Sequence, residues 1–176
     1  VAAELGRPIE VVRVKKAKDL SQLSALFLPG GESTTFSALA AFADRLRESI
    51  DGGLPVFATC AGAIFLANEV RDAAVGPTRQ KVLGVLDIEV VRNAYGRQKN
   101  SFEAVLEVGG VGEVRAVFIR APAVVKTWGR AEPLAYVDTP GLGRTVAVVS
   151  QGPHLATTFH PELSTAVLHA YFLQRL

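Results

Sequence analysis

Two apolar runs in the first third of the chain each stop at a turn of small residues. The run SALFL ends in Pro29-Gly30-Gly31, and the run LPVFAT ends at Cys60, which Ala61-Gly62 follow. The segments after these turns, 32–50 and 61–70, have patterns that predict helices. Strands that alternate with helices in this way predict an α/β fold, a three-layer sandwich in which helices cover both faces of a mostly parallel central sheet.

Other parts of the chain have strand patterns. Near the start, Ile9–Val14 alternates as a strand. Four segments of the second half are strand-like, namely VLGVLDIEVVRN, SFEAVLEV, EVRAVFIRA and LAYVD. The stretch TVAVVSQGPHLATTFH predicts a hairpin, and STAVLHAYFLQRL predicts a closing helix. No repeat or linker divides the chain, so we expect residues 1–176 to form a single domain with an added antiparallel portion in its second half.

Composition excludes several classes of protein. The 176 residues, 49% of them hydrophobic, are enough to bury one core. A net charge of +2, scattered along the chain, does not suggest a surface for nucleic acid. No apolar stretch is long enough to span a bilayer, so we expect no membrane partner. The single cysteine rules out an internal disulfide and favours a reducing compartment, which predicts a cytoplasmic protein.

The cysteine lies where a nucleophile elbow would be expected. Such an elbow needs a strand, a sharp turn that exposes the side chain at the edge of the sheet, and then a helix. Ala61 and Gly62 are small enough for that turn, and the N-terminus of the helix favours a thiolate at Cys60. The alternative is a buried cysteine that acts as a small hydrophobic residue. The local pattern leaves both interpretations open, because a thiol nucleophile also needs a base.

Of the three histidines, His160 is the strongest candidate for this base. It follows a predicted strand and precedes Pro161, and Glu162 lies two positions further on. If His160 lies beside Cys60, it can take the thiol proton while Glu162 fixes its tautomer. The alternative is a core histidine next to a carboxylate at the start of a helix. We expect His154, in a turn, to be exposed, and His169, on the last helix, to have a surface or packing role.

Five motifs together resemble a known family. PGGEST, TCAG and FHPEL are similar to the motifs of class I, triad-type glutamine amidotransferases, whose domain is flavodoxin-like. RNAYGRQKNSFE and FIRAP narrow the resemblance to the glutaminase subunit of pyridoxal 5′-phosphate synthase, the PdxT/SNO family. The resemblance covers nearly the whole chain. It implies hydrolysis of L-glutamine to L-glutamate and ammonia, and transfer of the ammonia to a synthase subunit that makes pyridoxal 5′-phosphate.

The resemblance also implies roles for individual residues. Cys60 matches the nucleophile of the family, His160 the general base and Glu162 the carboxylate that orients it. Backbone N–H groups of Gly31 and Ala61 can hold the oxyanion. The remaining substrate positions that match are Gly31, Glu32, Ser33, Arg92, Ile119 and Arg120. The resemblance implies neither a cofactor nor a metal.

The chain departs from the family at its start. The family begins with an apolar strand that ends in a Leu-Gln-Gly motif, whereas this sequence opens on VAAEL, contains no methionine and has no such segment. We therefore expect that it lacks this first strand. Two further functions stay open: a non-catalytic remnant that only binds the synthase, and another cysteine hydrolase on the same fold.

Overall fold

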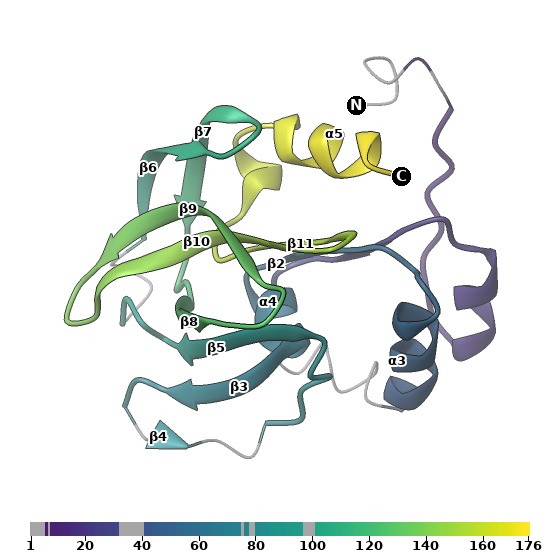
Figure 1. Cartoon of the computed structure of the whole chain (residues 1–176), viewed down its shortest axis with the longest axis horizontal. Coiled ribbons are helices and arrows are strands. Elements are labelled where there is room, and N and C mark those ends of the chain that lie inside the picture. Colours follow the sequence, from purple (N-terminus) through teal and green to yellow (C-terminus); the bar gives the residue numbers. More distant parts are fainter. Residues whose placement is uncertain (1–5, 7, 32–40, 75, 78–79, 97–100) are drawn as a thin grey trace.

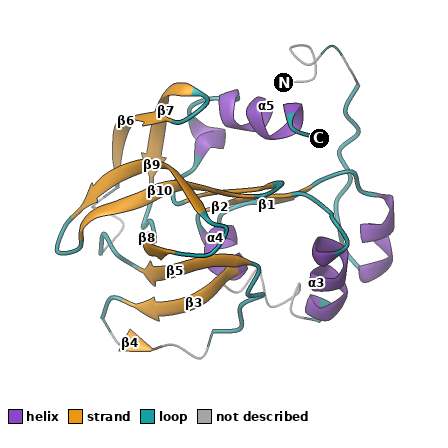
Figure 2. Ribbon diagram, viewed as in Figure 1, coloured by secondary structure: helices purple, strands orange, loops and turns teal. Residues whose placement is uncertain are grey.

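The computed structural model describes residues 6, 8–31, 41–74, 76–77, 80–96 and 101–176. Its main sheet runs in the order β1-β2-β11-β10-β8-β5-β3-β4, with β9 paired to the other edge of β10, and β6 and β7 form a separate two-stranded sheet (Figures 1 and 2). The strands are β1 (Leu26–Leu28), β2 (Val56–Thr59), β3 (Ala67–Asp72), β4 (Gly76–Pro77), β5 (Leu86–Arg92), β6 (Phe102–Val108), β7 (Gly112–Phe118), β8 (Ala123–Thr127), β9 (Glu132–Thr139), β10 (Gly143–Gln151) and β11 (His154–Thr157). The helices are η1 (Ala17–Gln22), α3 (Ala43–Asp51), α4 (Ala61–Leu66), η3 (Pro161–Leu163) and α5 (Val167–Gln174).

The sheet combines two parallel groups with a central antiparallel part. Strands β1, β2 and β11 are parallel to one another, and so are β3 and β5. Between the two groups, β10 is antiparallel to β8, β9 and β11, and β8 is antiparallel to β5. The expected antiparallel portion of the second half is therefore present. It is more extensive than the sequence indicates, because it separates the two parallel groups.

Helices lie on both faces of the sheet, as the sequence predicts. Side chains alternate between the faces of a strand. In β2, Val56 and Ala58 pack into the core that α3 and α4 cover, whereas Phe57 packs into the core beneath α5. The β6–β7 hairpin lies beside α5 over this second core (Figure 1). The predicted three-layer α/β arrangement is confirmed.

Strands β5, β8 and β11 come together at one point of the sheet. Along β10, Val148 pairs with Thr157 at the end of β11, and Val146 pairs with Val124 near the start of β8. Strands β11 and β8 therefore pair with the same edge of β10 one after the other, and β8 begins next to the end of β11. On the other side of β8, Ala123 pairs with the next-to-last residue of β5. The ends of β11 and β5 and the start of β8 thus lie close together.

Two sequence predictions are wrong in detail. Ile9–Val14 forms no strand and has mostly exposed side chains, because it pairs with no strand in the described part of the chain. The helix expected over 61–70 ends at Leu66, and the following residues form β3, because pairing with β5 outweighs the local helical pattern. Strands β4 and β8 were not predicted.

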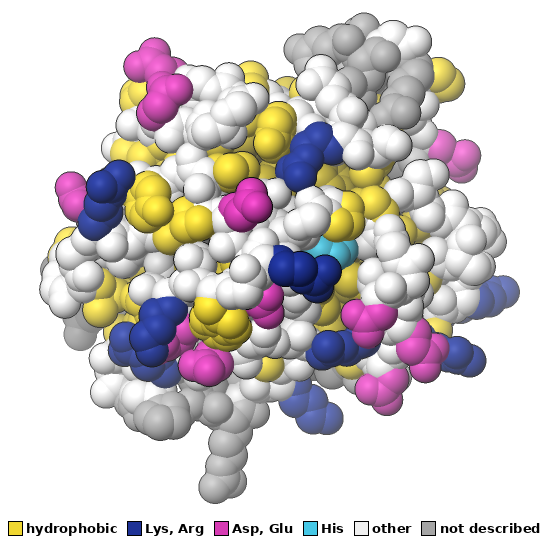
Figure 3. Space-filling model, viewed as in Figure 1, with side chains coloured by type: hydrophobic (Ala, Val, Ile, Leu, Met, Phe, Trp, Pro, Cys, Tyr) yellow, Lys and Arg dark blue, Asp and Glu magenta, His cyan; other side chains and the backbone are white. Residues whose placement is uncertain are grey.

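On the face drawn in Figure 3, charged side chains of both signs are interspersed without a large patch of one sign.

Candidate active site

Cys60 lies at a strained turn between β2 and α4. Its backbone has φ 49° and ψ −108°, a conformation that is rare for a residue with a side chain. The backbone N–H of Cys60 donates to the carbonyl of Thr157 at 2.8 Å, which fixes the turn against β11. The thiol is buried, with 7% of the residue exposed. Strain that the surrounding structure maintains is typical of functional sites, and here it falls on the single cysteine.

The small residues after Cys60 are required by close packing. A Cβ atom on Gly62 would lie 2.2 Å from the carbonyl oxygen of Leu28 in β1, far inside the normal contact distance. Gly62 therefore lets the first turn of α4 pack directly on the backbone of β1. The predicted order of strand, Cys60, small residues and helix is present, although the helix is short.

His160 and Glu162 lie next to each other after β11. Nδ1 of His160 is 2.7 Å from Oε1 of Glu162, and the backbone N–H of His160 donates to the carbonyl of Val117 in β7 at 2.9 Å. The His160 side chain is 14% exposed and that of Glu162 is 39% exposed. A carboxylate at Nδ1 directs the other ring nitrogen, Nε2, away from η3 and makes it the atom free for chemistry.

The imidazole of His160 also interacts with the thiol. The hydrogen bond with the side chain of Cys60, reinforced by that with Glu162, raises the pKa of His160 to about 10. Burial alone would raise the pKa of Glu162, but hydrogen bonds from His160 and from its own backbone N–H lower it below the usual value. These contacts therefore favour the imidazolium form of His160 and the carboxylate form of Glu162.

Gly30 packs against both catalytic candidates. A Cβ atom on Gly30 would lie 2.3 Å from Cε1 of His160 and 3.0 Å from Cβ of Cys60. The backbone N–H of Gly30 donates to Oγ1 of Thr59, the residue before the cysteine, at 3.0 Å. Thr59 is a residue that the sequence did not single out. Its buried hydroxyl fixes the start of the glycine loop beside the thiol.

The rest of the glycine loop is only partly described. Gly31 has φ 144°, a conformation that L side chains rarely adopt, and it is exposed. Glu32 and Ser33, two of the substrate positions that the resemblance implies, lie outside the described residues. Ala61 is the first residue of α4, and N–H groups in the first turn of a helix have no partner within it. The N–H of Ala61 thus has no partner within α4, and it belongs to the residue next to Cys60.

Arg92, Ile119 and Arg120 lie where the strands come together. Arg92 ends β5. Ile119 and Arg120 connect β7 to β8, directly after the segment whose Val117 carbonyl accepts from His160. Arg120 has φ 45°, a left-handed backbone conformation that is uncommon for a residue with a side chain. The strand registers therefore bring Arg92 to the part of the sheet where β11, the strand before His160, ends, and Ile119 and Arg120 immediately precede the strand β8 that begins there.

The two other histidines do not join this cluster. His154 was expected to be exposed, which is wrong: it is buried, and its Nδ1 accepts the backbone N–H of Val56 at 3.3 Å. Burial, aided by the charge of Arg130, lowers the pKa of His154. His169 stacks on Phe27 at a centroid distance of 5.7 Å, which agrees with the packing role expected for it.

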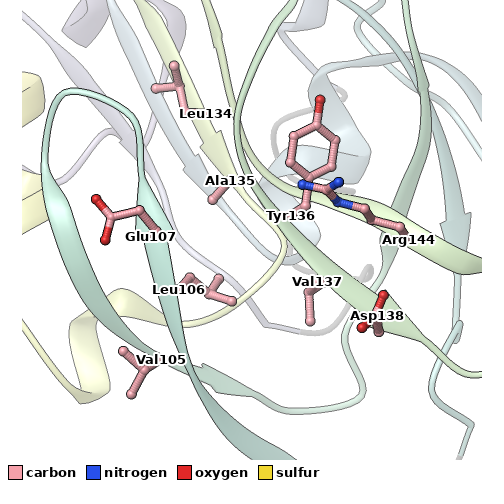
Figure 4. Close-up of a pocket in the computed structure, with 9 residues that line it drawn as sticks. All are labelled: Val105, Leu106, Glu107, Leu134, Ala135, Tyr136, Val137, Asp138 and Arg144. Carbon is pink, nitrogen blue, oxygen red and sulfur yellow. The ribbon is translucent and has the colours of Figure 1, made fainter.

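A pocket elsewhere on the surface is separate from this site. It has a volume of about 250 Å³ and lies between β6 and β9, where Arg144 covers the ring of Tyr136 at 4.3 Å (Figure 4). None of the catalytic candidates lines it.

Among the described residues, no group of three or more His, Cys, Asp or Glu side chains could hold a metal ion. No helix in the same part of the chain has both the length and the apolar character needed to cross a bilayer.

Sequence comparison identifies close relatives. The chain is 55% identical over 175 residues to the pyridoxal 5′-phosphate synthase subunit PdxT of Pyrobaculum neutrophilum, which covers 98% of this chain and 87% of that relative. The PdxT subunit of Korarchaeum cryptofilum is 51% identical over 174 residues, and this alignment covers 98% of this chain and 86% of that relative.

Solved structures agree with this relationship. A crystal structure of a glutamine amidotransferase with 44% identity has a TM-score of 0.83 and covers 99% of this chain and 89% of that one. A glutamine amidotransferase from Thermotoga maritima, at 16% identity and a TM-score of 0.55, covers 98% of this chain and 66% of that one, and supports the fold alone. The model of the SNO glutamine amidotransferase family matches residues 4–176. With its strained cysteine turn, its adjacent histidine and glutamate, and these similarities, the chain belongs to the SNO glutamine amidotransferase family.

Proposed function

We propose that residues 1–176 form a single amidotransferase domain that hydrolyses L-glutamine to L-glutamate and ammonia, with Cys60, His160 and Glu162 as its catalytic triad. The observation that supports this most strongly is the row of three interacting groups: the thiol with the imidazole, and the imidazole with the carboxylate at 2.7 Å. Nucleophile, base and orienting carboxylate are the three roles that hydrolysis through a covalent intermediate needs.

The first half of the reaction forms a thioester. The thiolate of Cys60 attacks the side-chain carboxamide carbon of glutamine, and the carbonyl oxygen becomes an oxyanion. Backbone N–H groups of Gly31 and Ala61 lie in segments that flank the thiol and can donate to this oxyanion. His160, as the imidazolium, then gives its proton to the departing nitrogen, the carbon–nitrogen bond breaks, and ammonia leaves.

The second half releases glutamate. His160, now neutral, takes a proton from a water molecule that attacks the thioester carbon. The carbon–sulfur bond breaks, the thiolate of Cys60 is restored, and glutamate is released. Throughout, Glu162 holds Nδ1 of His160, so that Nε2 faces the reacting atoms.

Substrate selection needs groups that recognise the ammonium and carboxylate of a free amino acid. We assign the ammonium to Glu32, and the carboxylate to Arg92 or Arg120, since a guanidinium can bind a carboxylate through two hydrogen bonds. Ser33 and Ile119 complete the set of substrate positions. Arg92 ends β5 and Arg120 precedes β8, and these two strands meet near the end of β11, which supports the assignment.

We further propose that the ammonia passes to a synthase subunit that builds pyridoxal 5′-phosphate. The support is that relatives at 51–55% identity over nearly the whole chain are PdxT subunits of pyridoxal 5′-phosphate synthase. We place the activity in the cytoplasm, because a reducing compartment keeps a single thiol free.

Replacement of the thiol tests the proposal. The variant Cys60→Ala keeps a small apolar side chain at a buried position, so the fold and association with the synthase should survive. Glutamate release from L-glutamine should fall to the uncatalysed level, with the synthase subunit and without it, and a thermal melt should confirm that the variant is folded. Undiminished glutamine turnover in Cys60→Ala would show that Cys60 is not the nucleophile.

A further inference from the structure

The carboxylate of Glu162 makes few hydrogen bonds. Its side chain is 39% exposed. Within the described residues its hydrogen bonds are those from His160 Nδ1 and from its own backbone N–H. A side chain with three rotatable bonds and hydrogen bonds only within its own turn has nothing outside the turn to fix its direction. The position of the carboxylate therefore depends on the backbone turn that holds it.

That turn is short. It is the 3₁₀ helix η3, three residues long, and within it Leu163 N–H donates to His160 O at 3.3 Å and Ser164 N–H donates to Pro161 O at 3.1 Å. Isolated 3₁₀ turns have poor hydrogen-bond geometry and little stability of their own. Something outside η3 must therefore hold it in place.

Strand β7 supplies two anchors for the turn. The backbone N–H of His160 donates to the carbonyl of Val117 at 2.9 Å, and the hydroxyl of Ser164 donates to the carbonyl of Arg115 at 2.5 Å. One anchor lies just before η3 and the other just after it. The second anchor is made by a side chain, so a single substitution can remove it without changing the backbone.

The two carbonyls lie on the same edge of β7. Strand β7 pairs with β6 through a register in which Val105 faces Arg115 and Glu103 faces Val117. Carbonyls of residues two apart in a strand point to the same edge, and those of Arg115 and Val117 point away from β6 toward the turn. Strand β7 is itself held to β6, since Nε of Arg115 donates to Glu103 at 2.7 Å. The turn therefore rests on a supported strand.

From this arrangement we infer that Ser164 is a positioning residue of the active site: its hydroxyl fixes η3 on β7 and thereby holds the Glu162 carboxylate at Nδ1 of His160. The inference rests on the proposed function for its catalytic meaning. The geometric claim, that the Ser164 hydroxyl keeps the imidazole and the carboxylate together, stands without it.

Loss of the hydroxyl has a defined consequence. In Ser164→Ala the turn keeps the burial of Pro161 but only one of its two hydrogen bonds to β7, that at Val117, so η3 can pivot and the Glu162 carboxylate spends less time at Nδ1. A typical hydrogen bond contributes about 1 kcal/mol. If that much is lost from the His160–Glu162 contact, the equilibrium between imidazolium and neutral imidazole shifts about fivefold toward the neutral ring. The pKa of His160 should then fall by roughly 0.7 units. Ser164 does not touch glutamine, so kcat should fall about fivefold while KM stays close to that of the unaltered chain.

The direct test is an NMR titration of the His160 ring in the full chain. The titratable groups that act on His160 are Cys60 and Glu162, and His169 acts on Glu162 from α5; all three stay unaltered. Ser164→Thr keeps a hydroxyl and should restore the titration. Thr165→Val is the matched control, because the neighbouring hydroxyl accepts a local hydrogen bond, from the N–H of Val167 at 3.2 Å.

The expected result is a lower pKa of His160 in Ser164→Ala alone, with Ser164→Thr and Thr165→Val close to the unaltered chain. The same pKa in all four proteins overturns the inference, and so does an equal fall in Ser164→Ala and Thr165→Val. If Ser164→Ala does not fold, Ser164→Thr becomes the test. A lowered pKa of His160 or a lowered kcat in Ser164→Thr then overturns the inference. The titration does not depend on turnover, whereas absence of glutamine hydrolysis by the unaltered chain would count against the proposed function.

Discussion

Replacing Gly30 with alanine introduces one methyl group at the contact between the glycine loop and the catalytic candidates. The new Cβ would lie 2.3 Å from Cε1 of His160 and 3.0 Å from Cβ of Cys60. Carbon atoms in contact normally lie about 3.5 Å or more apart, so the imidazole must move by roughly 1 Å or the loop must retreat by as much. Both outcomes separate groups that must be aligned for attack and proton transfer.

The magnitude follows from this displacement. A misplacement of about 1 Å in a catalytic group costs on the order of 100-fold in rate, which corresponds to roughly 2.7 kcal/mol of transition-state stabilisation. Because the backbone of Gly30 does not have a positive φ and its N–H can still donate to Thr59, the fold should tolerate the change. The loss should therefore appear in kcat/KM for glutamine more strongly than in the melting temperature.

The assay is glutamate release in the presence of the synthase subunit, paired with a thermal melt of each variant. Gly109→Ala is the matched control, since its Cβ would lie 3.6 Å from the carbonyl oxygen of Leu134, an ordinary contact. We expect Gly109→Ala to retain activity and Gly30→Ala to lose about 99% of it while staying folded. An active Gly30→Ala enzyme would refute the placement of the His160 ring beside the glycine loop.

Two further predictions concern stability. In Gly62→Ala the Cβ would lie 2.2 Å from the carbonyl oxygen of Leu28, and we expect a loss of about 1–3 kcal/mol in the free energy of unfolding, measured by urea denaturation; an unchanged midpoint would contradict the close approach of α4 to β1. The raised pKa of His160 means that the protonated ring stabilises the folded state, fully below pH 6.5 and progressively less as the pH rises to about 10. The difference in unfolding free energy between the unaltered chain and His160→Asn should therefore shrink over this range, and a constant difference would contradict the interactions assigned to the ring.

The local part of the active site could be predicted from the sequence. The strained turn at Cys60 requires a strand before it, small residues after it and then a helix. The residues that meet these requirements are next to one another in the sequence. The same holds for the contact between His160 and Glu162, which are two positions apart. Short-range geometry is strongly constrained by backbone sterics, so pattern reasoning is effective there.

Long-range pairing was the part that the sequence did not reveal. The alternation in Ile9–Val14 is typical of a strand, but a strand needs a partner, and the described chain gives it none. The pattern after Leu66 suits a helix, yet β3 forms there because β5 provides an edge for it. His154 looked exposed because it follows a turn, whereas a hydrogen bond from Val56, 98 positions away, holds it inside.

The positioning residues were missed for the same reason. Thr59 and Ser164 bond to the backbone of residues 29 and 49 positions away, and a hydroxyl gives no sign in the sequence of a distant partner. Serine and threonine are common in turns, where their hydroxyls usually bond locally. Only the folded arrangement distinguishes a hydroxyl that supports the active site from one that does not.

The most direct test of the central claim is covalent trapping of the active thiol with an electrophilic glutamine analogue, followed by intact-mass and peptide mass spectrometry. The chain has one cysteine, so an adduct on sulfur can be assigned without ambiguity. We expect one adduct per chain, on Cys60, with loss of glutaminase activity, protection by L-glutamine and much slower labelling of His160→Asn. A chain that hydrolyses glutamine at full rate with Cys60 unlabelled, or that labels equally fast without His160, would contradict the account.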